Sequence, residues 1–516
     1  MKISDSTQPA PSPTGPLRNI VILGGGSAGL LTAIGISKHL PDARLQVVRS
    51  SKMGVIGVGE GTIATIGRFL HGYLQIDPVD FHQQVHPSIK LGIQFDWGSE
   101  LPYHYSFSPQ FSAANRIHQN FPAPVGFYCQ ADARFANLAS CLMTQGKVAS
   151  RGPDGSPVLP PRFAYHLENK RFVNFLESFS DTCGIEKLDA LVERVEVDPL
   201  GVQALVLDNG QSVTADLFID CSGFRSELLG KALQEPFVSF KEALFCDRAV
   251  VGGWTRSDET YYAFTRAEAM ESGWCWQIEH DTIINRGYVY SSDFISDQDA
   301  ETEFREKNPR VTDTRIIQFN SGVYRRSWVK NVVAIGNSAG FVEPLEATAI
   351  GFISSASDQL ISLLQSCAEG VTDIHRDLFN RQQETNWNQT RDFLALHYQP
   401  NQQNHSPFWQ ACRHDLQLGD AQEILDFYQV AGPDFRALDG RLRSNIFGAE
   451  GYLSILVGQN VPYRRQPVVS ENVTRRWNDV RKRLSSMADE GVDMADYLEQ
   501  VRSGKLPFMR APQASP

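Results

Sequence analysis

The spacing of hydrophobic residues changes along the chain. Residues 19–40 run from a β-branched segment through GGGSAG into an Ala/Leu/Ile-rich segment, which predicts a strand, a turn and a helix. Apolar strands are predicted again within 215–226 and 331–351, each followed by a turn that contains glycine. Toward the C-terminus the spacing becomes helical, in segments 358–370, 420–432 and 473–491. The pattern predicts an α/β fold with strand-rich insertions and a C-terminal helical module.

Two strand-like segments carry unusual side chains. Residues 86–98, HPSIKLGIQFDWG, contain one lysine, Lys90, and such a lysine is usually the solvent-facing side chain of a half-buried strand. In ESGWCWQIEH (271–280), Trp274 and Trp276 alternate, so they face the same side of the predicted strand. Paired aromatic residues of this kind are often core residues.

Composition narrows the class of protein. The chain has 516 residues, 42% hydrophobic and 21% charged, as ordinary globular proteins do. Its formal net charge of −11 argues against nucleic acid or an anionic membrane as the main partner. No apolar run reaches the ~20 residues that span a bilayer, and the polar segments 1–18 and 506–516 are predicted to be flexible tails. Eight cysteines without a CxxC pair indicate reduced thiols, a cytoplasmic protein and no metal site.

The glycine-rich turn near residue 25 is a candidate nucleotide site. Its GxGxxG motif falls on Gly24, Gly26 and Gly29. The first glycine permits a tight turn, the second lets the backbone approach a pyrophosphate, and the third lets the helix pack on the strand. Ser27 and Ala28 begin the predicted helix, whose N-terminal amides and dipole favour phosphate.

The following strand bears on which dinucleotide is bound. Arg49 stands where an acidic residue usually grips the ribose, which fits either an NADP phosphate or an FAD ribose. Two later segments favour FAD, one ending its strand at Asp220 and one turning at Gly336 and Asn337 before a helix predicted after Pro344. We also assign Val192 to the cofactor site.

Six segments resemble, in order, the motifs of the flavin-dependent halogenases typified by tryptophan halogenases. They are MGVIGVGEGTIATIGRFL (53–70), PSIKLGIQFDWG (87–98), ESGWCWQIEH (271–280), GFVEPLEATAIG (340–351), LALHYQPNQQNHSPFWQACR (394–413) and GYLSILVGQNVP (451–462). With the glycine motif, the resemblance extends from about residue 19 to residue 462. It departs from the family motifs at Glu279, where the family has proline, and at Ala349, where it has glycine.

The resemblance implies an FAD-binding fold of the hydroxylase type and the halogenation of an electron-rich aromatic ring with FADH2, oxygen and chloride or bromide. Lys90 matches the catalytic lysine that receives the halogen of hypohalous acid. Glu346 matches the carboxylate that orients this electrophile or takes the ring proton. An acid at a helix start also stabilises the helix dipole, a role for which Glu343 is better placed.

The same resemblance implies further roles. It assigns Val58 and Gly59 to the flavin, the amides of Thr348 and Ala349 to the halide, Trp274 and Trp276 to the separation of flavin from substrate, and Phe408, Trp409 and Tyr452 to a substrate cap.

The sequence also suggests how the enzyme would be organised. We expect an FAD-binding domain at 19–360 and a substrate-capping helical module at 361–505. Since no second nicotinamide-binding unit is evident, a separate NAD(P)H-dependent flavin reductase would supply FADH2 for an indole or tryptophan-like substrate. The sequence leaves open whether the protein forms a homodimer. An FAD-dependent aromatic monooxygenase and a flavin-dependent sensor or scaffold remain alternatives.

Overall fold

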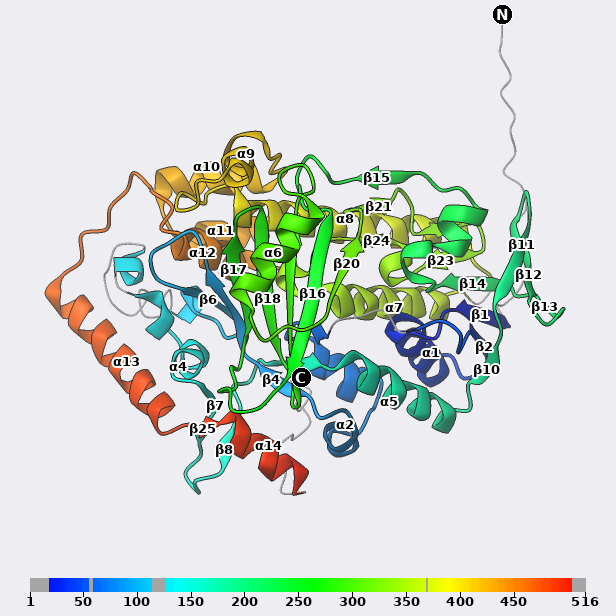
Figure 1. Cartoon of the computed structure of the whole chain (residues 1–516), viewed down its shortest axis with the longest axis horizontal. Helices are drawn as coiled ribbons and strands as arrows, with labels where there is room; N and C mark the ends of the chain where they lie inside the picture. Colours follow the sequence, from blue (N-terminus) through cyan, green and yellow to red (C-terminus); the bar gives the residue numbers. More distant parts are fainter. Residues whose placement is uncertain (1–17, 55–58, 114–125, 131, 368–369, 504–516) are drawn as a thin grey trace, which may run out of the picture.

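A computed structural model describes residues 18–54, 59–113, 126–130, 132–367 and 370–503. Its first large sheet is parallel except for the antiparallel edge strand β22, and it forms from the short β-branched runs near the glycine turns (Figure 1). In spatial order its six strands are β10 (Glu186–Asp189), β2 (Arg44–Arg49), β1 (Asn19–Leu23), β14 (Leu217–Asp220), β23 (Val332–Ala334) and β22 (Trp328–Val329). The glycine motif directly follows β1, and the C-terminal ends of β2 and β14 lie near it.

The second large sheet has seven strands and lies at the centre of the view in Figure 1. In spatial order they are β20 (Thr314–Gln318), β16 (Arg248–Thr255), β19 (Ile283–Tyr290), β18 (Gly273–Glu279), β17 (Thr265–Met270), β5 (Gly92–Asp96) and β6 (Tyr103–Ser106). Trp274, Trp276 and Ile278 alternate along β18, and all three belong to one hydrophobic core with the C-terminal helices. The two tryptophans therefore face the same side, as predicted.

Four smaller sheets complete the strands. They are β3 (Glu60–Gly61), β9 (Ala164–Leu167) and β4 (Ser88–Lys90); β11 (Val192–Asp198), β12 (Gly201–Leu207) and β13 (Ser212–Val213); β15 (Phe237–Ser239), β21 (Gly322–Tyr324) and β24 (Gly340–Phe341); and β25 (Val492–Asp493), β7 (Lys147–Arg151) and β8 (Pro157–Val158). The predicted strand-like run 86–98 divides into β4 and β5, which belong to different sheets. The division falls at Leu91, whose N–H donates to the carbonyl of Ala263.

The helices cover the two large sheets. They are α1 (Ser27–His39), α2 (Pro78–Val85), α4 (Leu138–Thr144), α5 (Asn169–Thr182), α6 (Asp297–Lys307), α7 (Ala349–Gln365), α8 (Asp373–Tyr398), α9 (Pro407–Asp415), α10 (Ala421–Ala431), α11 (Phe435–Leu442), α12 (Gly448–Gly458), α13 (Glu471–Asp489) and α14 (Met494–Arg502). Short turns of 3-10 or π type are η1 (Arg68–Tyr73), η2 (Phe127–Gln130), η3 (Ala133–Phe135), η4 (Gly223–Arg225), η5 (Glu227–Ala232), η6 (Gly336–Ser338) and η7 (Pro344–Glu346). The helical segments predicted from the sequence correspond to α7, α10 and α13.

The C-terminal helices do not form a separate core. Buried residues of α8, α9, α10 and α12 belong to the same hydrophobic cluster as β5 and β18. The predicted boundary at residue 360 falls inside α7, and the domain division itself stays a prediction. The fold prediction, an FAD-binding α/β domain with inserted strands and a helical C-terminal part, is confirmed. Within the described residues, no helix combines the length and apolarity needed to cross a membrane.

Candidate active site

A cleft of about 410 Å³ opens where the strands of the first sheet end. Seven residues assigned to the cofactor line it: Gly24, Gly26, Ser27, Ala28, Arg49, Val192 and Asn337. Gly29 and Gly336 lie next to these residues, while Val58 falls outside the described residues. The assignments themselves stay predictions, but the structure gathers most of them around one cleft.

The three motif glycines have different surroundings. Gly24 has a φ of +127°, and a Cβ there would lie 2.2 Å from the carbonyl oxygen of Cys221. A Cβ on Gly29 would lie 1.9 Å from the carbonyl oxygen of Gly24, so this glycine lets α1 pack on β1. A Cβ on Gly26 would meet nothing within 4 Å, because it would enter the cleft. Open space above a helix N-terminus fits the pyrophosphate of FAD.

Arg49 does not stand alone at the end of β2. Its guanidinium pairs with the carboxylate of Glu177 in α5 at 2.5 Å, and both residues line the cleft. A carboxylate at this position would repel the 2′-phosphate of NADP and can accept hydrogen bonds from ribose hydroxyls. The geometry favours FAD over NADP. No sequence motif marks Glu177, because it reaches the cleft from α5, far along the chain from β2.

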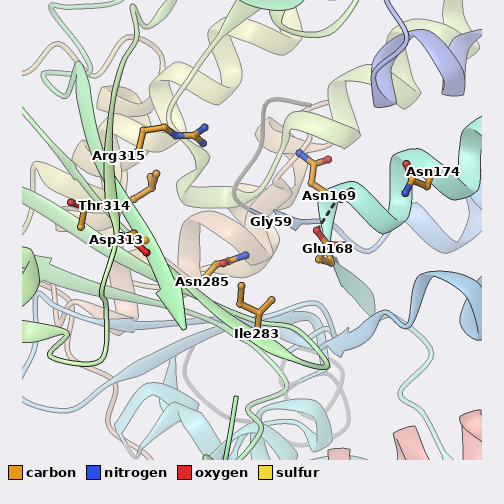
Figure 2. Close-up of a pocket in the computed structure, with 12 residues that line it drawn as sticks. Gly59, Glu168, Asn169, Asn174, Ile283, Asn285, Asp313, Thr314 and Arg315 are labelled. Carbon is orange, nitrogen blue, oxygen red and sulfur yellow. Dashed lines mark hydrogen bonds between the residues drawn. The ribbon is translucent and has the colours of Figure 1, made fainter. Parts of the chain in front are cut away.

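A second cavity, of about 570 Å³, lies beside Gly59 (Figure 2). Asn169 and Asn174 of α5 line both cavities, so the two adjoin. Asn285 and Ile283 of β19 and Arg315 of β20 approach from the opposite side in Figure 2. Gly59 has a φ of +95°, and a Cβ there would collide with His280 at 2.3 Å. The assigned flavin residue Gly59 therefore lies where the cofactor cleft meets the second sheet.

Glu60 is an acidic group of the cleft that the motifs did not single out. It is half-buried in β3 and lines the same cleft as the glycine motif. Burial raises its pKa to about 7. Strand β9 pairs with both β3 and β4, which places the Glu60 segment next to the Lys90 segment. The cofactor cleft and the lysine are thereby joined through one three-stranded sheet.

Lys90 is fully buried, so it is not the solvent-facing residue that the pattern alone would suggest. Its Nζ has no hydrogen-bond partner among the described residues and lies 5.6 Å from the centroid of the Phe107 ring. Burial lowers the pKa of Lys90 to about 7, although the nearby carboxylate of Glu346 acts in the opposite direction. Near neutral pH the amine is therefore present in both protonation states.

Glu346 ends the 3-10 turn η7 and is also buried. Its Oε1 lies 2.7 Å from Nε2 of His397, which α8 supplies. The α-helix begins at Ala349 rather than directly after Pro344, since Ala347 adopts a left-handed conformation with a φ of 54° and interrupts the turn. The carboxylate thus belongs to a tight turn before the helix, on the side where it acts on Lys90.

Glu343, the better candidate for a helix-start charge from the sequence, lies directly before the 3-10 turn η7 and not at the start of an α-helix. It is buried, and it accepts hydrogen bonds from the hydroxyl of Tyr398 at 2.7 Å and the indole N–H of Trp274 at 3.3 Å. Burial raises its pKa to about 7. The adjacent residues His397 and Tyr398 thus bind Glu346, at the end of η7, and Glu343, just before it, respectively. Glu343 holds the indole of Trp274.

Trp274 and Trp276 are both buried, with ring centroids 6.0 Å apart. Trp276 packs against Gly287 of β19, where a Cβ would lie 2.0 Å from the indole ring. A glycine at that position leaves the space that the indole fills. The pair is packed into the sheet, and its role as a barrier between flavin and substrate stays a prediction.

The two residues assigned to the halide lie at the start of α7. Thr348 is the N-cap and Ala349 the first residue, so the N–H groups of the first turn have no partner within the helix. Ala349 lies outside the set of residues with positive φ, so the replacement of the family glycine by alanine causes no backbone strain. Ala349 lines the cofactor cleft. Halide binding by these amides stays a prediction.

The three residues assigned to the substrate cap are buried in aromatic packing. The indole N–H of Trp409 donates to the carbonyl of Met270 at 2.9 Å, and the Phe408 ring lies 5.6 Å from Phe294. The Tyr452 ring lies 5.0 Å from Phe393 in a tilted arrangement, and Phe393 in turn contacts His397. Contact of these three residues with substrate stays a prediction. Among the described residues, no three His, Cys, Asp or Glu side chains cluster as a metal site requires.

Comparisons with known proteins agree with this geometry. The tryptophan halogenase family model matches residues 19–473. Tryptophan 7-halogenase KtzQ of Kutzneria sp. (strain 744) is 30% identical over 95% of this chain and 99% of its own. Tryptophan 7-halogenase RebH of Lentzea aerocolonigenes is 28% identical over 94% of this chain and 99% of its own.

Solved structures agree as well. MibH, a lanthipeptide tryptophan 5-halogenase, superposes with a TM-score of 0.85 at 33% identity, covering 96% of this chain and 95% of its own. BrvH, a flavin-dependent halogenase from Brevundimonas sp. BAL3, superposes with a TM-score of 0.81 at 28% identity, covering 94% and 99%. With a cleft that fits FAD and a buried lysine and glutamate beside it, the chain belongs to the tryptophan halogenase family and is a flavin-dependent halogenase.

Proposed function

We propose that this enzyme halogenates an electron-rich aromatic ring, first of all an indole, with chloride or bromide. Oxygen and FADH2 are the other co-substrates, and a separate NAD(P)H-dependent flavin reductase supplies the FADH2. The observation that carries the proposal is the buried Lys90, which has no hydrogen-bond partner among the described residues and titrates near neutral pH.

The reduced flavin, when bound, supplies the chemistry that turns halide and oxygen into hypohalous acid. The residues of the cleft would bind and orient the cofactor. Gly26 opens onto the space that would hold the pyrophosphate, and the Arg49–Glu177 pair would hold the ribose. The N–H groups at the start of α7 are donors that fit a halide ion. Ala349 lines the cofactor cleft, and the Glu346 carboxylate, three residues earlier in the chain, acts on Lys90.

Lys90 would receive the halogen. A neutral amine can attack hypohalous acid, forming an N–halogen bond and releasing water, whereas an ammonium can only hydrogen-bond it. Because burial lowers the pKa of Lys90 to about 7, both forms are populated at physiological pH. Glu346 acts on the same amine electrostatically and is fixed by His397, so it is placed to take the ring proton after halogen transfer.

We propose an indole ring because the relatives act on tryptophan. Whether the indole belongs to a small molecule or to a peptide is the question that the substrate panel answers. KtzQ acts on tryptophan, and MibH on a tryptophan in a lanthipeptide. This chain resembles both, so the first substrate panel should hold free indole, tryptophan and short tryptophan-containing peptides.

The decisive experiment supplies the enzyme with FADH2 from an added reductase, in chloride and in bromide, and follows products by mass spectrometry. Lys90→Ala should retain FAD binding and hydrogen peroxide release but lose ring halogenation. More than a few per cent of residual product would refute the role of Lys90. If the purified protein instead oxidised NADPH alone and hydroxylated the ring, the monooxygenase alternative would replace the proposal.

A further inference from the structure

The end of β18 carries Glu279 where the family motif has a proline. Its side chain is 1% exposed and forms an ion pair with Arg256, whose side chain is 5% exposed. The amide of Gln277 also donates to Glu279 at 2.6 Å. Where the family has a proline, whose side chain forms no hydrogen bond, this chain therefore has a buried carboxylate that is bound by both Arg256 and Gln277.

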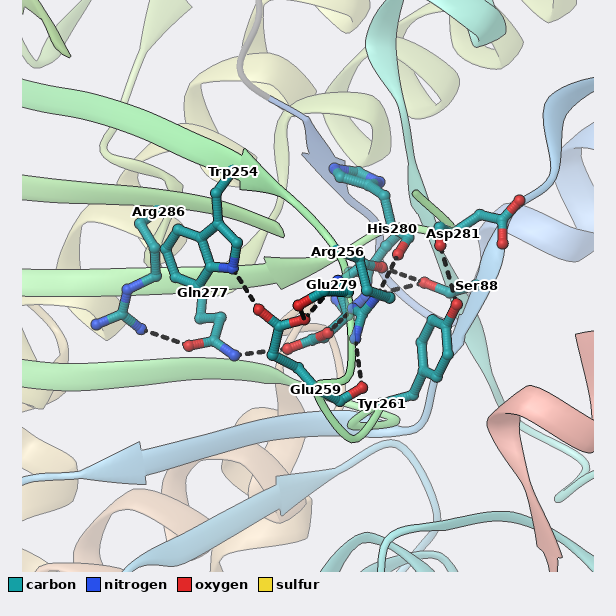
Figure 3. Close-up of polar contacts among 12 residues, drawn as sticks. Ser88, Trp254, Arg256, Glu259, Tyr261, Gln277, Glu279, His280, Asp281 and Arg286 are labelled. Carbon is teal, nitrogen blue, oxygen red and sulfur yellow. Dashed lines mark hydrogen bonds and ion pairs between the residues drawn. The ribbon is translucent and has the colours of Figure 1, made fainter. Parts of the chain in front are cut away.

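Arg256 ties this carboxylate to the connection between β16 and β17. It donates to the backbone carbonyls of His280 at 3.2 Å and Glu259 at 3.1 Å, and its guanidinium lies 3.8 Å from the centroid of the Tyr261 ring (Figure 3). The hydroxyl of Tyr261 in turn donates to the carbonyl of Asp281 at 2.9 Å. Arg256 and Tyr261 thus hold the backbone that directly follows Glu279.

The backbone of Glu279 is also the anchor of the lysine strand. Its carbonyl accepts a hydrogen bond from the hydroxyl of Ser88, which begins β4 two residues before Lys90 (Figure 3). Residues two apart on a strand point to the same face, so Ser88 and Lys90 lie on one side of β4.

A buried polar chain continues from Ser88 toward the amine. Nδ1 of His166 lies 3.4 Å from the Ser88 hydroxyl, and Nε2 lies 2.8 Å from the hydroxyl of Thr265. A Cβ on Gly61 would lie 3.3 Å from Nζ of Lys90 and 3.5 Å from the hydroxyl oxygen of Thr265. Lys90 and Thr265 therefore border the same small volume, at the opposite end of a chain that starts on the Glu279 carbonyl.

We propose that the Arg256–Glu279 ion pair positions Lys90, by holding the Glu279 carbonyl on which Ser88 and strand β4 are anchored. The pair replaces the rigidity that a proline gives to this strand end. Neither residue contacts the reacting atoms, so both are positioning residues. The inference rests on the proposed function of Lys90 as the halogen acceptor.

The first test separates positioning from folding by measuring where the halogen goes. In Glu279→Gln, halogenated product should fall at least ~10-fold, because a displaced amine captures less hypohalous acid. Hypohalous acid that escapes, trapped with monochlorodimedone, should fall less than ~2-fold, since the cofactor cleft is untouched. A merely destabilised enzyme would lose both in proportion.

Glu235→Gln is the matched control. The Glu235 side chain is 3% exposed and pairs with Arg326, and it lies in the connection between η5 and β15, outside the second large sheet. In this control variant, the ratio of halogenated product to escaped hypohalous acid should equal the ratio in the wild type. Ser88→Ala removes the hydrogen bond to the Glu279 carbonyl without leaving a charge unpaired. It therefore tests the positioning role if Glu279→Gln does not accumulate as folded protein. An unchanged ratio in folded Ser88→Ala or Glu279→Gln would overturn the proposal.

A second measurement needs no turnover and so remains valid if the proposed function fails. Competitive acetylation of Lys90, read by mass spectrometry of its peptide, should be at least ~3-fold faster in Ser88→Ala and Glu279→Gln than in wild type or Glu235→Gln. Equal rates in all four proteins would refute the positioning role. Faster acetylation without any halogenated product from the wild type would refute the proposed function alone.

Discussion

Nε2 of His397 lies 2.7 Å from Oε1 of Glu346, with both side chains buried. Nδ1 of the same ring lies 2.8 Å from the carbonyl oxygen of Phe393, which can only accept a hydrogen bond. Nδ1 therefore carries a proton, and Nε2 and the carboxyl group share one more. The pair is either an imidazolium with a carboxylate or a neutral imidazole with a carboxylic acid. In both forms it holds a single proton next to Lys90.

Glu346→Gln tests whether the Glu346 carboxyl group accepts the proton that leaves the ring. A glutamine amide can donate to Nε2 of a neutral His397, so the contact survives and the thermal midpoint should stay within a few degrees of wild type. The amide cannot act as a base, so product formation should fall at least ~100-fold. FADH2 oxidation and peroxide release, followed by absorbance, should not change. Normal halogenation would return Glu346 to a purely structural role, and lost FADH2 oxidation would move it to the flavin side.

Neighbouring residues of α8 should differ in their effects. His397→Gln removes the ring that shares the proton with Glu346, and product formation should fall at least ~10-fold. Tyr398→Phe removes only the hydroxyl bonded to Glu343, so it should cost about 1 kcal/mol of stability and reduce product formation less than ~3-fold. Product yields and denaturation midpoints of both variants check this contrast. Equal product yields from His397→Gln and Tyr398→Phe would show that the hydrogen bond between His397 and Glu346 is not needed for halogenation.

Lys90 should impose a pH dependence on stability. Its pKa is about 7 in the folded protein and 10.5 for an ordinary lysine, so the unfolded chain binds more protons between these values and stability rises with pH across that window. Lys90→Met lacks this titration. It should be more stable than wild type at pH 7, and its advantage should shrink toward pH 10 by up to ~1.4 kcal/mol per pH unit.

Denaturant titrations of wild type and Lys90→Met at several pH values measure this difference. The exposed Lys482 of α13 provides the control, since Lys482→Met should keep a constant offset from wild type at every pH. A constant offset for Lys90→Met as well would mean that Lys90 titrates as an exposed lysine does.

Gly26 and Gly29 should separate cofactor binding from folding. A side chain at Gly26 enters the empty cleft, so Gly26→Leu should fold normally but lose FAD affinity by at least ~100-fold, because it occupies the space of the pyrophosphate. Gly29→Ala would press a methyl group into the Gly24 carbonyl, so it should lower the thermal midpoint instead. Flavin titration and circular dichroism give both readouts. Unchanged FAD affinity in folded Gly26→Leu would contradict the assignment.

The elements that could be predicted from the sequence have strong local signals. The glycine turn, the alternating tryptophans of β18 and the helices of the C-terminal part are each encoded by spacing within one segment. Lys90 could be singled out as unusual, and its motif match suggested a role.

The surroundings of these residues could not be predicted, because they depend on contacts between distant segments. From the sequence Glu343 is only a candidate helix-start charge, and its hydrogen bonds with Trp274 and Tyr398 come from distant segments. Glu177 reaches Arg49 only when α5 packs beside β2. In the sequence Glu279 is only a departure from the family motif. The structure explains why a carboxylate can be buried there, because Arg256, just after β16, forms an ion pair with it.

The last described helix has a consequence for biosynthesis. Residues of α14 pack in the same core as Ile89 and Leu91, on either side of Lys90, and Arg502 forms an ion pair with Asp281. The ribosome makes this helix after every other described element. The packing on the Ile89 and Leu91 face of β4, although this strand is translated early, is therefore complete only once residue 502 has left the exit tunnel.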